Sequence, residues 1–195
     1  FADVHDFAAV WMPERHFHAF SGLFPNPAVT SAAIAAVTQR AGLGTLVTPP
    51  FFRNPAILAK QVATLDAIAG PGRAIVGLGA GWFAPEFEQT GCAFPPLRER
   101  LRALEETAQI LKSLWNEEKT TFTGRHFQVH DAVSQPKPPV RPQILVGGGG
   151  EKVLMGIAAR HADIWNNMAV FQGQLAQKVE ALKREAAAWP GMVGL

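Results

Sequence analysis

The segment VWMPERHFHAF, residues 10 to 20, places charged and imidazole side chains directly after a short apolar run. If that run is a strand, Glu14, Arg15, His16 and His18 follow its carboxyl end, where α/β folds bind ligands. A histidine in this position can donate or accept a proton near neutral pH. The same residues can also form a surface salt-bridge cluster, and the segment alone leaves both interpretations open.

Metal binding and nucleophilic catalysis are the other chemistries that the sequence could support. His16 and His18 are only two residues apart in a predicted loop with no clear third ligand, so no metal site is expected. The sequence has no G-x-S-x-G motif, and Cys92 stands close to a phenylalanine and two prolines. This setting indicates packing rather than an activated thiol.

The stretch RAIVGLGAGWFAPEF, residues 73 to 87, runs from an apolar strand into Gly77, Gly79 and Gly81. Glycine at a strand end allows a backbone to come close to a ligand or to another part of the chain. A dinucleotide fold is disfavoured, because bulky Trp82 follows the glycines and no acidic residue ends a strand about 20 residues later. A ligand contact and simple helix packing both fit the remaining pattern.

A second glycine segment joins a predicted strand to a predicted helix in LVGGGGEKVLMG, where Gly147 to Gly150 are consecutive. Free amides at a helix N-terminus attract anions through hydrogen bonds and through the helix dipole. The segment is not a P-loop, because no G-K-[ST] follows it. Four glycines cost conformational entropy that a plain connector need not lose, so we predict a phosphate-binding turn.

These segments must be positioned by strands and helices that alternate along most of the chain. Asn26 and Gly70 are suited to a helix N-cap and a helix C-cap, and Thr123-Gly124 suggests a hairpin outside the main sheet. The expected strands are residues 7–12, 43–48, 73–79, 143–148 and 162–167, and the expected helices are residues 25–40, 54–70, 97–115, 151–162 and 172–189.

Apolar strands separated by helices predict an α/β fold with a parallel sheet covered by helices. About five βα units fit either a doubly wound sheet or a (β/α)₈ barrel that lacks about three of its eight strands. Composition and periodicity leave both architectures open. No linker-like segment divides the chain, so a single domain over residues 1–195 is expected.

Composition narrows the classes of partner. The formal net charge is only +2 and no apolar run of about 18 residues occurs, so neither nucleic acid nor a membrane is expected. One cysteine and no visible signal segment predict a cytoplasmic protein. The chain opens on Phe1 rather than Met, which suggests that its natural start lies further upstream.

Four segments, in this order, resemble the bacterial luciferase-like superfamily, whose members are (β/α)₈ barrels that use FMN or coenzyme F420. They are WMPERHFHAFSGLFPNP, LGTLVTPPFFRNPAILAKQVATLDAIAGPGR, GLGAGWFAPEFEQTG and PQILVGGGGEKVLMGIAARHADIW. The resemblance implies a luciferase-like TIM barrel that is incomplete here, with its first and last strands missing from these 195 residues. Residues up to about Arg40 resemble FMN-dependent members, and those from Gly42 onward resemble F420-dependent members.

The resemblance implies roles for single residues. His16 matches the histidine that faces the redox ring in F420 enzymes, and Glu14 keeps the acidic residue beside it, so these two are the expected catalytic residues. Arg15 stands where the luciferases have their catalytic histidine, which disfavours peroxyflavin chemistry of the luciferase kind. Trp82 stands where sugar-phosphate F420 dehydrogenases have an acid, which disfavours that substrate class.

The residues that the resemblance assigns to coenzyme binding lie at three strand ends. The first group includes a non-proline peptide bond that is often cis in the family, the second passes the ring edge, and the third cradles the phosphate. They are Leu46, Val47 and Thr48; Gly79, Ala80 and Gly81; and Gly147, Gly148, Gly149 and Gly150. The luciferases have a phosphate-binding arginine at the Ala80 position, and its absence favours F420.

The implied function is F420-dependent hydride transfer to or from a small organic substrate, with F420 or FMN as the cofactor. An FMNH2-dependent monooxygenase of natural-product metabolism is the first alternative. A non-catalytic truncated barrel fragment is an alternative from another class. An open barrel leaves unpaired strand edges, and we expect a homodimer.

Overall fold

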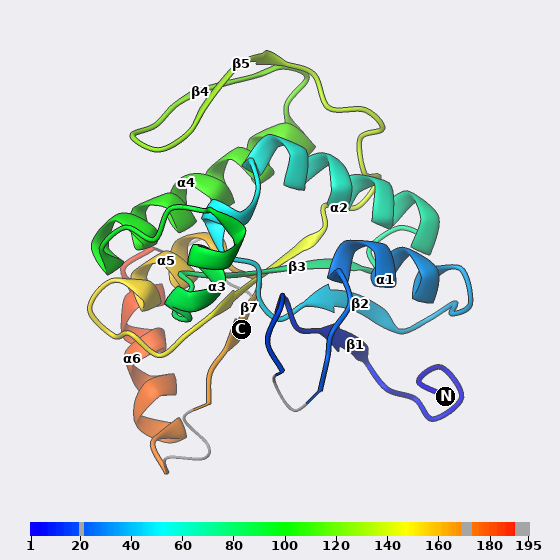
Figure 1. Ribbon diagram of the computed structural model, residues 1–195, viewed down its shortest axis with the longest axis horizontal. Coiled ribbons are helices and arrows are strands. Elements are labelled where there is room, and N and C mark those ends of the chain that lie inside the picture. Colours follow the sequence, from blue (N-terminus) through cyan, green and yellow to red (C-terminus); the bar gives the residue numbers. More distant parts are fainter. Residues whose placement is uncertain (20–21, 169–172, 190–195) are drawn as a thin grey trace.

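The computed structural model describes residues 1–19, 22–168 and 173–189, in which helices line one side of a parallel sheet (Figure 1). The strands are β1 (Ala9–Met12), β2 (Gly42–Thr45), β3 (Ala74–Gly79), β4 (Thr120–Thr123), β5 (Gln128–Ala132), β6 (Gln143–Gly147) and β7 (Ile164–Asn166). The helices are α1 (Pro27–Ala35), α2 (Pro55–Ala69), α3 (Ala84–Thr90), α4 (Leu97–Asn116), α5 (Leu154–His161) and α6 (Leu175–Ala187), with a 3-10 turn η1 (Pro50–Phe52).

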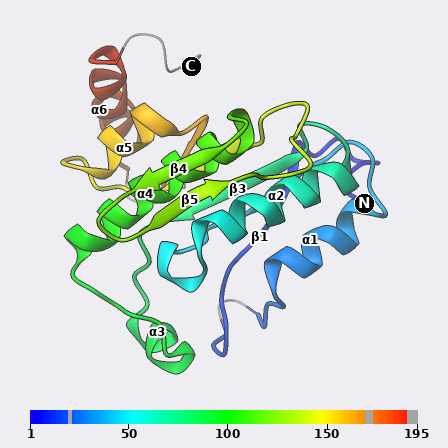
Figure 2. The same ribbon diagram turned by 90° about the horizontal axis from the view of Figure 1, so that it is seen from above.

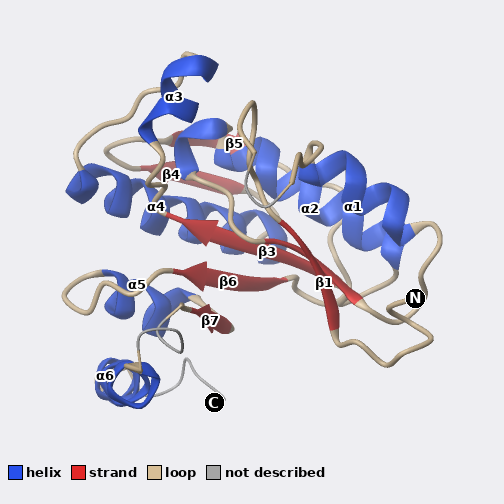
Figure 3. Ribbon diagram, turned by 60° about the horizontal axis from the view of Figure 1, so that its bottom comes forward, coloured by secondary structure: helices blue, strands red, loops and turns tan. Residues whose placement is uncertain are grey.

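The strand order of the main sheet decides between the two predicted architectures. β1, β2, β3, β6 and β7 lie side by side in chain order, and every neighbouring pair is parallel. A doubly wound sheet reverses its order at a switch point, so the doubly wound alternative is wrong. Adding each strand on the same side through right-handed crossovers puts the helices on one face. Figure 3 shows α1, α2 and α4 together along that face of a curled half-barrel.

The predicted helix caps and the hairpin are confirmed. The Asn26 side chain accepts hydrogen bonds from the amides of Ala28, at 3.0 Å, and Val29, at 3.4 Å, and so caps α1. Gly70 ends α2 with a φ of +101°. The hairpin is β4–β5, an antiparallel pair that lies over α4 and outside the main sheet (Figure 2).

Other element boundaries differ from the sequence-based expectation. β1 begins at Ala9, two residues later than expected, and Phe7 is exposed before it. β1 is an edge strand of the described sheet. Residues 151–153 form a turn, so α5 begins at Leu154. The final helix begins at Leu175, and residues 169–172 lie outside the described part of the chain. Helix α3 was not predicted, since seven residues are too few to show a helical period.

Alternation along β3 separates the core from the concave face of the sheet. Val76 and Leu78 face the helices and belong to the main apolar core. Gly77 and Gly79 alternate with them on the other face. A Cβ atom at Gly77 would lie only 1.9 Å from the carbonyl oxygen of Thr45. The close approach of β2 to β3 therefore requires glycine at this position.

Candidate active site

The segment after β1 carries a charged cluster at the carboxyl edge of the sheet. Glu14 and Arg15 are buried, with exposed fractions of 6% and 8%, so the surface-cluster interpretation is wrong. Nε2 of His16 lies 3.2 Å from Oε1 of Glu14. The structure therefore joins the two residues predicted to be catalytic in one hydrogen-bonded pair.

A second partner of Glu14 comes from the connection between η1 and α2. Nη1 of Arg53 donates a hydrogen bond to Oε2 of Glu14 at 3.2 Å, and Nη2 donates to Oε1. Burial alone would raise the pKa of Glu14, but the hydrogen bond from His16, the charge of Arg53 and a hydrogen bond from Thr48 outweigh it. The pKa of Glu14 is consequently below its usual value, and Glu14 is a buried, ionised carboxylate.

The pKa of His16 changes in the opposite direction from that of Glu14. Its hydrogen bond to Glu14 raises the pKa of the imidazole above the usual value, against the smaller effect of partial burial. With Nε2–H donating to the carboxylate, Nδ1 is the ring nitrogen left for another partner. Neutral His16 presents Nδ1 as an acceptor and protonated His16 presents it as a donor, so this nitrogen can receive or deliver a proton.

Helix α3 holds the same segment from another side. Oε1 of Glu86 accepts a hydrogen bond from the backbone amide of His16, and Oε2 lies 3.4 Å from Nη1 of Arg15. The Arg15 guanidinium also lies 4.5 Å from the ring centre of Phe83 and 5.1 Å from that of Trp82. Arg15 thus helps to hold the segment in place.

Sequence reasoning missed Arg53 and Glu86. Both lie in the segment that follows a strand of the sheet, Arg53 after η1 in the connection from β2 to α2 and Glu86 on α3 after β3. The rule that ligand-binding residues gather at the carboxyl ends of parallel strands could have flagged both positions. Their partners lie 39 and 70 residues away in the sequence, and no local pattern indicates such a pairing.

An irregular segment connects β2 to the mouth of the half-barrel. Regular pairing of β2 with β3 stops at Gly44, and the amide of Thr48 then donates to the carbonyl of Gly77 at 2.7 Å. Between them, the Leu46–Val47 peptide bond is cis, as the family resemblance implies.

Val47 brings residues from two further strands together. Its side-chain atoms lie 2.4 Å from the position that a Cβ of Gly79 would take, and 2.9 Å from that of Gly147. These two glycines, which are register partners on β3 and β6, make room for Val47 on the concave face. A contact between them and a coenzyme stays a prediction.

The residues after β3 are also explained by packing within the chain. The Ala80 carbonyl accepts a hydrogen bond from Nε of buried Arg100 at 3.1 Å. Gly81 has a φ of +75°, and a Cβ there would lie 2.7 Å from the ring of Phe87. The helix-packing interpretation of this glycine stretch therefore has direct support.

The glycine turn after β6 is held by β7. The amide of Gly148 donates to the carbonyl of Asn166 at 2.9 Å. The carbonyl of Gly148 accepts hydrogen bonds from Nε1 of Trp165, at 2.9 Å, and Nδ2 of Asn167, at 3.1 Å. These contacts fix the first half of the turn on the edge of the sheet.

The second half of the turn lies beside α6. Nζ of Lys178 is 3.1 Å from the carbonyl oxygen of Gly149 and forms an ion pair with Glu151 at 2.6 Å. Among the described residues, no acceptor lies within hydrogen-bonding distance of the amides of Gly149 and Gly150. Two unpaired amides next to a lysine can receive an anionic group.

The predicted site residues thus form two groups on one edge of the sheet. Glu14, His16 and Thr48 gather at the ends of β1 and β2, and residues 147–150 follow β6. Along the sheet, β6 is three interstrand spacings, or about 14 Å, from β1 and two spacings, or about 10 Å, from β2. Val47, which precedes Thr48, lies against Gly147 and connects the two groups on the concave face.

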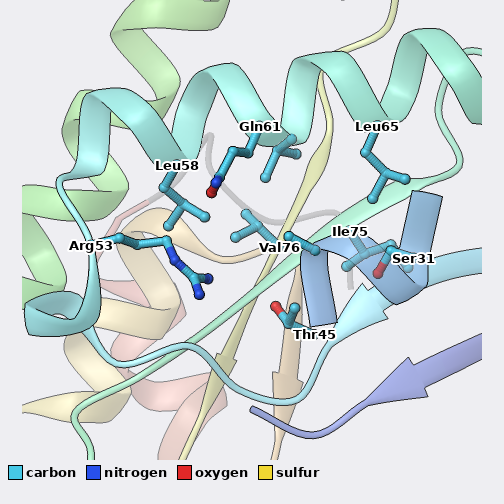
Figure 4. Close-up of a pocket in the computed structure, with 10 residues that line it drawn as sticks. Ser31, Thr45, Arg53, Leu58, Gln61, Leu65, Ile75 and Val76 are labelled. Carbon is cyan, nitrogen blue, oxygen red and sulfur yellow. The ribbon is translucent and has the colours of Figure 1, made fainter. Parts of the chain in front are cut away.

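A pocket of about 400 Å³, including its open mouth, lies between α1, α2 and the sheet. Most of its lining is apolar, and Figure 4 shows the Arg53 guanidinium directed into it toward Thr45. The guanidinium already binds Glu14. This pocket is on the helix side of the sheet, so it does not belong to the concave face.

Neither a metal-ligand cluster nor a membrane-spanning helix is found among the residues that the structure describes. Within them, no three side chains of His, Cys, Asp or Glu are close enough to hold a metal ion. Over the same ranges, no helix combines the length and the apolar character needed to cross a bilayer.

Comparison with known proteins identifies the family. A model of the luciferase-like monooxygenase family matches residues 1–190. The chain belongs to this family. The strand order of the main sheet and the cis Leu46–Val47 peptide bond agree with this family assignment.

Curated relatives of the luciferase-like chain use two different coenzymes. It is 39% identical over 76% of its length to an F420-dependent glucose-6-phosphate dehydrogenase of Kineococcus radiotolerans, of which 45% is covered. It is 33% identical over 83% of its length to an FMNH(2)-dependent dimethylsulfone monooxygenase of Pseudomonas fluorescens, of which 43% is covered. The chain therefore spans about half the length of the curated relatives it matches.

Solved structures similar to the chain include a dehydrogenase and a monooxygenase. An F420-dependent secondary alcohol dehydrogenase in complex with an F420-acetone adduct matches 98% of this chain, with a TM-score of 0.83 and 28% identity, over 60% of its own length. The monooxygenase RslO1 from Streptomyces bottropensis matches 96% of this chain, with a TM-score of 0.83 and 28% identity, over 57% of its own length. The cofactors used by this chain's relatives are thus F420 or FMN, as predicted.

Proposed function

We propose that this luciferase-like half-barrel is part of an oxidoreductase that transfers a hydride between coenzyme F420 and a small organic substrate. The observation that carries the proposal is the buried Glu14–His16 pair at the carboxyl edge of the sheet. Hydride transfer to or from a carbon that bears oxygen also moves a proton, and Nδ1 of His16 is placed to donate or accept it.

The residues after β6 fit a coenzyme with a phosphorylated tail. The unpaired amides of Gly149 and Gly150 can bind phosphate oxygens, and the ammonium group of Lys178, which pairs with Glu151, lies beside them. When bound, the deazaflavin ring supplies the carbon that takes or gives the hydride. The protein's own contribution is to bind the tail, to hold His16 in one orientation through Glu14, and to exchange the proton.

The coenzyme assignment is tested by spectral titration of the purified protein with F420 and, anaerobically, with reduced FMN. We expect F420 to bind, and Gly149→Leu to weaken its binding at least tenfold by filling the space beside Asn167, which is 2.6 Å from a Cβ built at Gly149. Gly150→Ala keeps the backbone amide, and its Cβ would meet no atom closer than 3.6 Å, so this variant measures the loss of backbone freedom in the turn without crowding.

The outcomes of this titration are distinct. Unchanged F420 affinity in Gly149→Leu would contradict the phosphate assignment. Binding of reduced FMN alone would favour the second candidate, an FMNH2-dependent monooxygenase, which the relative from Pseudomonas fluorescens supports. If the protein binds neither coenzyme, the non-catalytic alternative is favoured and the enzyme proposal fails.

We further propose that two copies of the chain associate through the outer face of α1 and α2. Helix α1 has no charged residue, and four exposed apolar side chains lie on or beside these helices: Val29 at 71%, Val37 at 82%, Ile57 at 56% and Ile68 at 51%. Exposed apolar side chains on helices that carry few charges are typical of a protein interface.

For the assembly, we expect Val29→Glu to convert a dimer into a monomer, because a charge would be buried at the contact. Light scattering coupled to size-exclusion chromatography measures the mass. Val133→Glu is the control, since Val133 is also exposed, at 57%, but follows β5. A wild-type monomer, or a dimer that persists in Val29→Glu, would rule out this interface.

A further inference from the structure

Arg53 contacts both carboxylate oxygens of Glu14. We infer that Arg53 is the positioning residue of the proton-transfer pair: its two-pronged contact holds Glu14 in place and balances its charge, so that His16 can release its proton. The inference rests on the proposed function for its chemical meaning. Its test measures the protonation of His16 directly and needs no coenzyme.

The burial of Glu14 makes a charged partner such as Arg53 necessary. The side chain of Glu14 is completely shielded from solvent, and a carboxylate in such a place requires charged or hydrogen-bonding partners. Arg53 occupies both carboxylate oxygens, and its own side chain is only 15% exposed. This fork geometry fixes the plane of the carboxylate as well as its position. Nε2 of His16 lies 3.2 Å from Oε1 of the carboxylate held in this way, which favours one orientation of the imidazole ring.

The balance of charges around His16 also depends on Arg53. The groups that face it come from three elements: Glu14 from the segment after β1, Arg53 from the connection before α2, and Glu86 from α3. Each acid has its own arginine, because Arg53 pairs with Glu14 and Arg15 pairs with Glu86. A proton on His16 is therefore an extra charge in a balanced cluster.

Removing Arg53 would disturb this balance in a predictable direction. Glu14 would keep its hydrogen bond to His16, but its negative charge would no longer be shared with a guanidinium and would act on the imidazole alone. The proton would then be held more tightly on His16. An enzyme with this change would have His16 protonated over a wider pH range and would lack a base in that range.

The experiment is an NMR titration of the six histidines, with His16→Ala used to identify the His16 signal. In Arg53→Gln we expect the His16 midpoint to rise by about one pH unit, the size expected when one nearby charge is removed. In Arg53→Lys we expect a smaller rise, since an ammonium keeps the charge but cannot span both oxygens. Arg184→Gln on α6, which removes an exposed arginine, should leave the midpoint unchanged.

A double-mutant cycle shows whether Arg53 acts through Glu14. In a Glu14→Gln background, Arg53→Gln should move the His16 midpoint by less than half as much as in the wild type. An equal shift in both backgrounds would mean that Arg53 acts on His16 directly, and would overturn the positioning role.

The remaining outcomes are also decisive. A folded Arg53→Gln protein with an unchanged His16 midpoint would overturn the inference. If Arg53→Gln does not fold, Arg53→Lys decides, and a midpoint equal to that of the wild type would overturn the inference. Failure to bind either coenzyme would refute the proposed function, yet a raised His16 midpoint would still establish the coupling between Arg53 and His16.

Discussion

Replacement of His16 by alanine is expected to lower turnover by a factor of about 10² to 10⁴, which is the usual contribution of a positioned proton donor or acceptor. Coenzyme affinity should change by less than about threefold, a free-energy difference well below 1 kcal/mol. The reason is the separation of the two groups, since His16 follows β1 and the proposed phosphate-binding turn follows β6, with β2 and β3 between them.

Steady-state kinetics and a coenzyme titration on the same preparation measure the two effects separately. His130→Ala is the matched control, because it removes an exposed histidine from β5, outside the main sheet. Equal losses of turnover and of coenzyme affinity in His16→Ala would contradict a role in proton transfer. Full activity in that variant would remove His16 from the mechanism altogether.

Gly77→Ala is expected to have the largest effect on stability, with a loss of more than about 4 kcal/mol in the free energy of unfolding. The added Cβ would lie 1.9 Å from the carbonyl oxygen of Thr45 and 3.2 Å from Cγ1 of Val47. The first atom belongs to the backbone, so no rotation of a side chain can relieve the clash. The hydroxyl of Thr45 also accepts a hydrogen bond from the Gly77 amide at 3.2 Å, which ties the two strands together here.

Urea denaturation followed by circular dichroism measures this loss, and failure to recover folded protein would agree with it. Gly22→Ala provides the control, since a Cβ at Gly22 would have no neighbour closer than 3.9 Å. A loss below about 1 kcal/mol in Gly77→Ala would mean that β2 and β3 can separate without cost, contrary to their close approach in the structure.

The two variants test different parts of one arrangement. Gly77 makes room for the carbonyl group of Thr45 at the end of β2. Three residues later, the amide of Thr48 donates a hydrogen bond to the Gly77 carbonyl at 2.7 Å. Thr48 in turn lies beside Glu14 and helps to lower the pKa of that carboxyl group. The packing of glycine on β3 is therefore linked to the ionisation of the acid that orients His16.

The sequence by itself determined the features that depend on neighbouring residues. Asn26 and Gly70 specify helix ends through their own side chain or backbone, and the Gly147–Gly150 run specifies a turn at a strand end. Alternating apolar strands and helices indicated an α/β fold. The motif order in the chain indicated the luciferase-like family, and the family match over residues 1–190 confirmed it.

Only the tertiary structure decided which distant residues meet. Strand order is a property of the assembled sheet. Composition and periodicity could therefore not reject the doubly wound alternative, and the barrel implied by the family resemblance was established by the sequence order of β1, β2, β3, β6 and β7. Arg53 and Glu86 reach the histidine segment across 39 and 70 residues, and Val47 fills the space left by glycines on two other strands. Local patterns record backbone preferences and burial, whereas pairing of charges and filling of space depend on positions that exist only after the chain has folded.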